Sequence, residues 1–173
     1  MYAGGLRIRL IKDNLTMALE DGLEQLGWLD PGRGHLPVKV LGDHKDSHEE
    51  AQPNIVVIST EFSDPEQVEL GSRLTRFDWE FYADVYAESS SIGLHLAGDV
   101  RDVISDRFSN VTTGIVGTRL SVLDLDVATP TEAFKVDVGE VRMAHSREYS
   151  RSYKAHWWMG SFIISDEYED DVR

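Results

Sequence analysis

The sequence predicts an α+β fold in a single domain over residues 1–173: one mixed, largely antiparallel sheet of about six strands with two main helices packed against it. Three observations support this prediction. Two segments carry apolar residues at helical spacing, and about six short segments are rich in β-branched residues or alternate between apolar and polar residues. The order of these segments is not the strict strand–helix alternation of a parallel sheet.

The two helices are predicted from their apolar stripes. In the first, apolar positions recur at steps of three and four: Ile8, Ile11, Leu15, Ala18, Leu19, Gly22 and Leu26. Gly27 follows as a C-terminal stop. The second helix is expected from residue 92 to about residue 108, after three serines at 89–91 that can cap it. Its core face comprises Ile92, Leu96, Val100, Val103 and Ile104.

Three strands are expected between these helices. They are "VKVLG" (38–42), "NIVVISTEF" (54–62) and "RFDWEFYADVYAE" (76–88). The segments at 30–37, 43–53 and 63–74 are rich in turn-forming or charged residues and predict loops.

Three more strands follow the second helix. In "TRLSVLDLDVATP", Leu123, Leu125 and Val127 alternate with aspartates, which predicts a half-buried strand that Pro130 ends. "FKVDVGEVRMAH" changes its apolar phase at Gly139, where a β-bulge would restore one buried face. "KAHWWMGSFIIS" is the last strand, and "DEYEDDVR" (166–173) is expected to be an acidic, mobile tail.

The segment at 76–88 has two different faces. One is apolar and predicts burial: Phe77, Trp79, Phe81, Ala83, Val85 and Ala87. The other mixes tyrosines with acids: Asp78, Glu80, Tyr82, Asp84, Tyr86 and Glu88. A mixed face of this kind is typical of a protein interface that is partly covered but wet, although a plain solvent face is the alternative. Trp157 and Trp158 are adjacent in a strand, so their rings are expected on opposite faces of the sheet.

Composition and charge restrict the possible functions. The formal net charge is −14, which disfavours tight binding of a phosphate backbone but permits DNA to slide past. The chain has no cysteine, which excludes disulfides and thiolate chemistry. No apolar run approaches the length of a membrane span, so no membrane partner is expected.

No catalytic, cofactor-binding or metal-binding residue is predicted. The sequence lacks phosphate-loop, dinucleotide-binding, nucleophile-elbow and zinc-protease motifs. His44 and His48, among acids in the 43–53 loop, could ligate a divalent metal if that segment were helical. A second group, His95, Asp99, Asp102 and Asp106, follows one stripe of the second helix. It is expected to be a solvated face, with a subunit contact or a pore lining as the alternatives.

The order of these features resembles the tail terminator, or tail completion, proteins of long-tailed phages, in particular those that infect actinobacteria. "NIVVISTE", "VELG", the aromatic strand ending in "DVYAE", the "GDVRD" helix and "VLDLDV" carry the resemblance, which covers residues 6 to about 165. These motifs are patterns of residue character, and none is a catalytic signature.

The resemblance implies a structural protein of the virion that is not an enzyme and needs no cofactor. Such a subunit is made in the host cytoplasm and forms a closed ring, typically a homohexamer, at the head-proximal end of the tail. The ring caps the tail tube protein, ends its polymerisation, meets the head–tail connector (head completion) protein and lets DNA pass.

Candidate interface or lumen residues follow from the mixed strand face and the acidic helix stripe. They are Glu69, Arg73, Arg76, Tyr82, Asp84, Tyr86, Asp99, Arg101, Asp102 and Asp106. Two alternatives stay open: a divalent-metal hydrolase that uses His44 and His48 or the helix stripe, and another neck or minor tail component.

Overall fold

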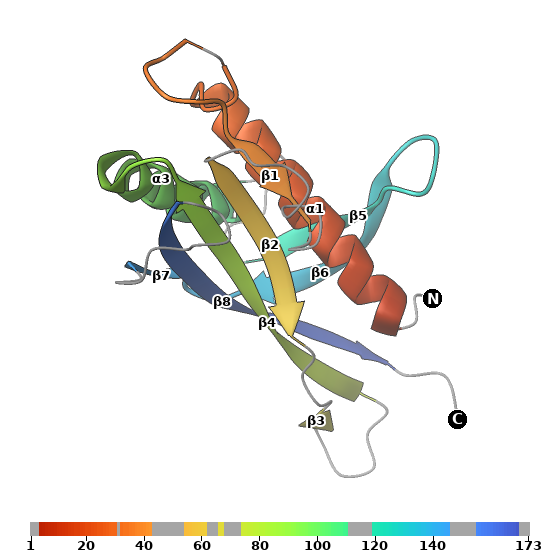
Figure 1. Cartoon of the computed structure of the whole chain (residues 1–173). Helices are drawn as coiled ribbons and strands as arrows, with labels where there is room; N and C mark the ends of the chain where they lie inside the picture. Colours follow the sequence, from red (N-terminus) through yellow and green to blue (C-terminus); the bar gives the residue numbers. More distant parts are fainter. Residues whose placement is uncertain are drawn as a thin grey trace.

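The described strands form one sheet, and both described helices pack against it. The structure, a computed structural model, describes residues 4–30, 32–42, 54–61, 66–67, 74–110, 119–145 and 155–169. Its elements are α1 (Gly4–Gln25), β1 (Lys39–Leu41), β2 (Ile55–Glu61), β3 (Glu66–Gln67), β4 (Leu74–Ala87), α3 (Ser90–Asn110), β5 (Arg119–Asp124), β6 (Thr131–Val138), β7 (Arg142–His145) and β8 (His156–Glu169). The main path through the sheet is β1-β2-β4-β8-β6-β5, with β3 beside β4 and β7 beside β8 (Figure 1). Within the described residues only β1 and β2 pair in parallel, so the predicted α+β fold with a largely antiparallel sheet is confirmed.

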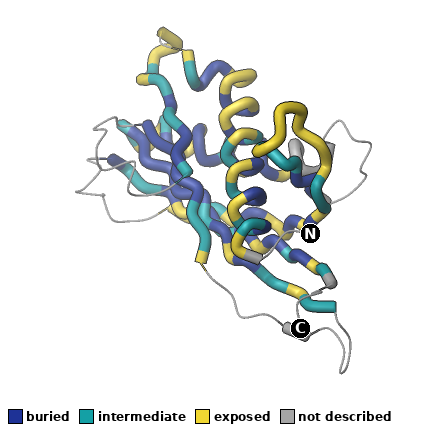
Figure 2. The backbone as a smooth tube through the Cα atoms, turned by 90° about the vertical axis from the view of Figure 1, so that its right-hand side faces the viewer, coloured by how far each residue is buried: buried dark blue, intermediate teal, exposed yellow. Residues whose placement is uncertain are grey.

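The long antiparallel pair of β4 and β8 is the centre of the sheet. The two strands stay in register over their full length, from Leu74 opposite Glu169 to Ala87 opposite His156. The side chains on their inner face belong to the main core, together with apolar residues of both helices. The predicted apolar face of the aromatic strand is therefore confirmed. Figure 2 shows that buried backbone gathers in these strands, while exposed and buried stretches alternate along the helices.

The caps predicted for the end of α1 and the start of α3 are both present, although α3 begins at Ser90, two residues before its predicted start. After α1, Gly27 has a φ of 81°, and its N–H donates to the carbonyl of Glu24. The N–H of Trp28 donates to the carbonyl of Leu23, which completes a Schellman motif. At the start of α3 the hydroxyl oxygen of Ser89 accepts a hydrogen bond from the N–H of Ile92 at 3.2 Å, as expected of an N-cap.

The predicted stripe of α1 was only partly correct. Leu26 lies at the end of the helix and is 48% exposed, whereas Leu10 and Leu23 are buried in the core. The helix ends at Gln25, so Leu26 belongs to the capping turn and not to the stripe, and the chain returns to the core at Trp28.

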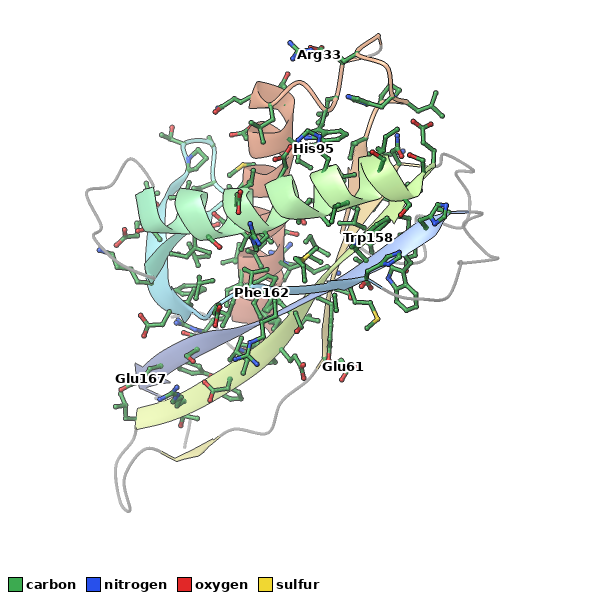
Figure 3. All side chains as sticks on the ribbon, turned by 90° about the vertical axis from the view of Figure 1, so that its left-hand side faces the viewer. Arg33, Glu61, His95, Trp158, Phe162 and Glu167 are labelled. Atoms are coloured by element: carbon green, nitrogen blue, oxygen red, sulfur yellow. The ribbon has the colours of Figure 1, made fainter. Side chains whose placement is uncertain are left out.

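Helix α3 lies so close to β8 that one of its positions admits only glycine. A Cβ added to Gly93 would lie 1.8 Å from the Trp158 ring, whereas a Cβ added to Gly98, on the same helix, would meet nothing within 4 Å (Figure 3). We expect Gly93→Ala to lower the free energy of unfolding by about 1–3 kcal/mol through overpacking. Gly98→Ala, the matched control, should raise it by up to about 1 kcal/mol through helix propensity. Chemical denaturation measures both, and equal effects of the two substitutions would contradict the close packing of α3 on Trp158.

The predicted bulge at Gly139 is confirmed. Val138 pairs with Ile164 and Arg142 pairs with Ser161. The chain therefore advances four residues from β6 to β7 where β8 advances three, which is the extra residue of a bulge. The N–H of Gly139 donates to the carbonyl of Ile163 at 2.7 Å within this irregularity. Val136, Val138 and Val141 consequently all reach the main core.

The predicted phase of the strand around Leu123 was wrong. β5 ends at Asp124, and its buried apolar residues are Leu120 and Val122. The pairing register with β6 shifts between Val122 and Leu123, and Val127 lies beyond the strand, 43% exposed. The apolar–polar alternation that predicted the later phase therefore runs into a turn.

The prediction of a mobile acidic tail from residue 166 was also wrong for residues 166–169. These residues extend β8 to Glu169, and residues 170–173 lie outside the described part of the chain. Asp166 is fully buried and forms a two-bonded ion pair with Arg7 of α1. Figure 1 shows why this pair can form, because the N-terminal end of α1 lies close to the end of β8.

Neither described helix is long and apolar enough to cross a membrane.

Candidate functional site

The outer face of the sheet is the candidate site, because both helices pack on the inner face and the apolar cluster on the outer face contains no described helical residue. At one end it carries a second, small apolar cluster to which no described helical residue belongs: Leu41, Ile55, Val57, Tyr86 and Ala155, with Trp157 packed against them. Further along the face, Met159 is 43% exposed and Ile163 is 51% exposed, although both occupy the central strand β8. Apolar side chains in the middle of a sheet are normally covered, so this part of the face is suited to a partner.

A groove of about 630 Å³ crosses this face over β2, β4, β7 and β8. We call it the outer groove. Its lining residues are Ser59, Thr60, Glu61, Glu80, Tyr82, Asp84, Arg142, Met143, Ala144, Trp157, Met159, Gly160 and Ser161. The strand register explains this composition, because Ser59 and Ser161 lie on either side of Tyr82 and leave space beside its ring. The groove therefore combines aromatic and thioether surface with carboxylates.

Negative charge dominates the outer groove. Glu61 and Glu80 lie directly opposite each other on β2 and β4, and both are exposed. Like charges in directly opposed positions destabilise a strand pair unless a cation is present. Arg142, the cation of the lining, has its Nε 4.0 Å from a carboxylate oxygen of Glu140, which lies outside the groove lining.

Burial and the negative charge of the outer groove raise the pKa of the Tyr82 phenol. Desolvation, a hydrogen bond to Glu80 and the charges of Glu80, Glu61 and Asp84 together raise the pKa of Tyr82 to about 12. A tyrosinate would add to the negative charge of its surroundings, so Tyr82 stays neutral in the ordinary pH range and donates its one hydroxyl proton to Glu80.

Two of the predicted interface residues are buried within the chain itself. Tyr86 is 4% exposed and stacks on Trp157, with 5.9 Å between ring centroids. Asp84 is 7% exposed and accepts a hydrogen bond from the indole N–H of Trp157 at 3.3 Å. The mixed face is therefore not uniformly exposed in a single chain: Tyr86 belongs to the second cluster and is buried, whereas Tyr82 is half-buried in the outer groove.

The predicted residues on α3 lie apart from the outer groove. Asp99 accepts a hydrogen bond from the indole N–H of Trp28 at 2.6 Å, and His95 packs edge-on against the same indole. Asp99 thus has a structural role, joining α3 to the end of α1. Arg101 and Asp102 are exposed and form an ion pair at 2.9 Å. The structure does not describe the side chain of Asp106.

The remaining candidates lie toward the start of β4. Arg76 is exposed and paired with Asp78 at 3.0 Å, and the Ser165 hydroxyl donates to the same carboxylate at 2.6 Å. Desolvation by burial raises the pKa of Asp78, but the hydrogen bonds from Ser165 and Arg76 and the charge of Arg76 outweigh it and leave this pKa lowered. Glu69 and Arg73 lie outside the described residues.

The prediction from sequence did not include four residues that define the groove: Glu61, Arg142, Trp157 and Met159. The available signal was in "WWMGSFII" (157–164), where large apolar residues occur at both odd and even positions. An apolar residue in each phase indicates that both faces of a strand need covering. Only the pairing of β8 with β4 and β7 shows which phase lies on the outer face.

The described residues contain no group of three or more His, Cys, Asp or Glu side chains that could hold a metal ion. His44 and His48, one of the two groups offered for the hydrolase alternative, lie outside those residues, and Asp99 of the other group, the helix stripe, accepts a hydrogen bond from Trp28. The alternative therefore gains no support from the described part of the molecule.

Comparison with models of known protein families gives no match, and neither does a search of curated protein sequences.

Proposed function

We propose that this protein is a structural subunit of a phage virion that assembles into a ring, caps the tail tube and joins the tail to the head connector. The observation that carries the proposal is the open outer face of β8, where Met159 and Ile163 are 43% and 51% exposed beside the aromatic and charged outer groove. A lone subunit leaves this surface in water, and a neighbouring copy in a ring would cover it.

Two further properties support the proposal. The order of sequence features resembles that of tail terminator proteins, as described above. The net charge of −14 suits a channel that DNA passes without being held, because a basic lining would bind the phosphates. In this proposal the ring is a homohexamer, and the partners are the tail tube protein on one side and the head completion protein on the other.

The oligomeric state tests this function directly. We expect the purified protein, alone or mixed with tail tube rings, to form closed rings in negative-stain images and to show the corresponding mass by light scattering. A protein that stays monomeric under both conditions would rule out the proposal. The length of tails assembled without the protein separates the two virion roles: overlong tails indicate a terminator, and tails of normal length that lack heads indicate another neck component.

A further inference from the structure

The outer groove has the chemistry of a site for cationic side chains. Tyr82 and Trp157 supply aromatic surface, and Glu61 and Glu80 supply two carboxylates that face each other across the β2–β4 pair. A guanidinium or ammonium group is attracted both by carboxylates and by the faces of aromatic rings. A bound cation would also relieve the repulsion between the two glutamates.

One segment of the chain has the complementary composition. Residues 146–154, "SREYSRSYK", contain Arg147, Arg151 and Lys154 against one acid, and they include two tyrosines. The whole chain has 17 basic and 31 acidic residues, so this segment reverses the overall balance of charge. It is the connection between β7 and β8 and lies outside the described residues.

The symmetry of a ring makes such a pair of surfaces necessary. In a ring of more than two identical subunits each contact is heterologous, so two different patches of the same chain must complement each other. Copies that each carry a charge of −14 repel one another, and a contact that places a basic segment against an acidic groove offsets this repulsion locally.

We infer that in the assembled ring the outer groove of each subunit receives the basic, tyrosine-bearing segment 146–154 of the next copy. This inference rests on the proposed function and adds to it the two surfaces that form the contact. Arg147 and Arg151 are the side chains expected to reach Glu61 and Glu80, and the Tyr82 ring offers aromatic surface to their guanidinium groups.

Charge reversal on each surface tests the inference. The groove variant Glu61→Lys/Glu80→Lys and the segment variant Arg147→Glu/Arg151→Glu should each raise the dissociation constant of ring assembly at least about tenfold, because like charges then meet across the contact. An equimolar mixture of the two variants should assemble again, since each contact then joins opposite charges. Light scattering and negative-stain imaging measure assembly, and circular dichroism and thermal unfolding verify that each variant is folded.

Matched controls separate this contact from a general effect of charge. Glu20→Lys/Glu24→Lys reverses two exposed acids on α1, and Arg33→Glu/Lys135→Glu reverses two exposed cations elsewhere. Both controls should assemble like the wild type. If they lose assembly to the same degree, net charge and not this contact governs the ring, and the inference is wrong.

The remaining outcomes are also decisive. If the wild type forms no ring, the proposed function fails. If it forms rings and both reversed variants assemble normally, only the inference fails. A third variant carries all four substitutions in one chain. If this variant assembles but the mixture of the groove and segment variants does not, the segment contacts the groove of its own chain, and the contact between copies is overturned. If the groove variant assembles but no longer binds tube rings, the groove accepts the tube protein instead of a second copy.

Discussion

Replacing Asp166 by alanine is expected to lower the free energy of unfolding by about 3–5 kcal/mol, because it leaves the charge of Arg7 buried without its partner. The Asp166 carboxylate is fully buried and accepts hydrogen bonds from the Arg7 guanidinium at 2.7 Å and 2.5 Å. The same guanidinium lies 3.7 Å from the centroid of the Phe134 ring and 4.5 Å from that of Tyr168. It therefore joins α1, β6 and the end of β8, and denaturant unfolding measures its contribution.

An apolar replacement of the whole pair is the control. Arg7→Met combined with Asp166→Leu removes both charges and keeps most of the volume, and such replacements are often close to neutral. We expect the double variant to be clearly more stable than Asp166→Ala alone. If Asp166→Ala has little effect, the pair does not hold the end of β8 against α1.

The local structure of this protein could largely be predicted from short-range patterns. Gly27 ends α1 because it adopts a φ of 81°, and Ser89 caps α3 through its own hydroxyl. The bulge at Gly139 follows from a change of apolar phase that one strand cannot otherwise accommodate. Each of these features depends on residues that are close in the sequence.

The errors arose where a distant partner decides the outcome. The acidic composition around Asp166 predicts a solvated tail, but Arg7, 159 positions away, provides the charge that allows its burial. Tyr86 has acids for neighbours in the sequence, but the pairing of β4 with β2 places Ile55 beside it. No pattern within either segment shows these partners.

Only the part of the candidate site that lies on β4 could be predicted, because the other strands that form it are distant in the sequence. Tyr82 and Asp84 belong to the predicted mixed face of β4, and both line the outer groove. Its other walls come from β2, β7 and β8, whose alignment with β4 is fixed by register. The sequence therefore predicts one wall of the groove, and the strand pairing supplies the others.

The second large effect is expected at Trp158. This side chain is 3% exposed, lies against Gly93 of α3 and stacks on His145 with 4.5 Å between ring centroids (Figure 3). Trp158→Ala should lower the free energy of unfolding by about 3–5 kcal/mol, because it removes a large core side chain and leaves a cavity. Chemical denaturation measures this loss.

Its neighbour Trp157 is the matched comparison, because the same residue type in the same strand faces the outer groove. It is half-buried, and its main ring contact is the stack on Tyr86. Trp157→Ala should lower the free energy of unfolding by about 1–3 kcal/mol, because it removes the stack on Tyr86 and the hydrogen bond to the buried Asp84 carboxylate but leaves no cavity in the main core. The same substitution should weaken ring assembly, because it removes one aromatic wall of the groove. A Trp157→Ala protein that unfolds as easily as Trp158→Ala would make the outer face a second core, whereas one that is stable but no longer assembles would identify that face as the surface that meets a neighbouring copy.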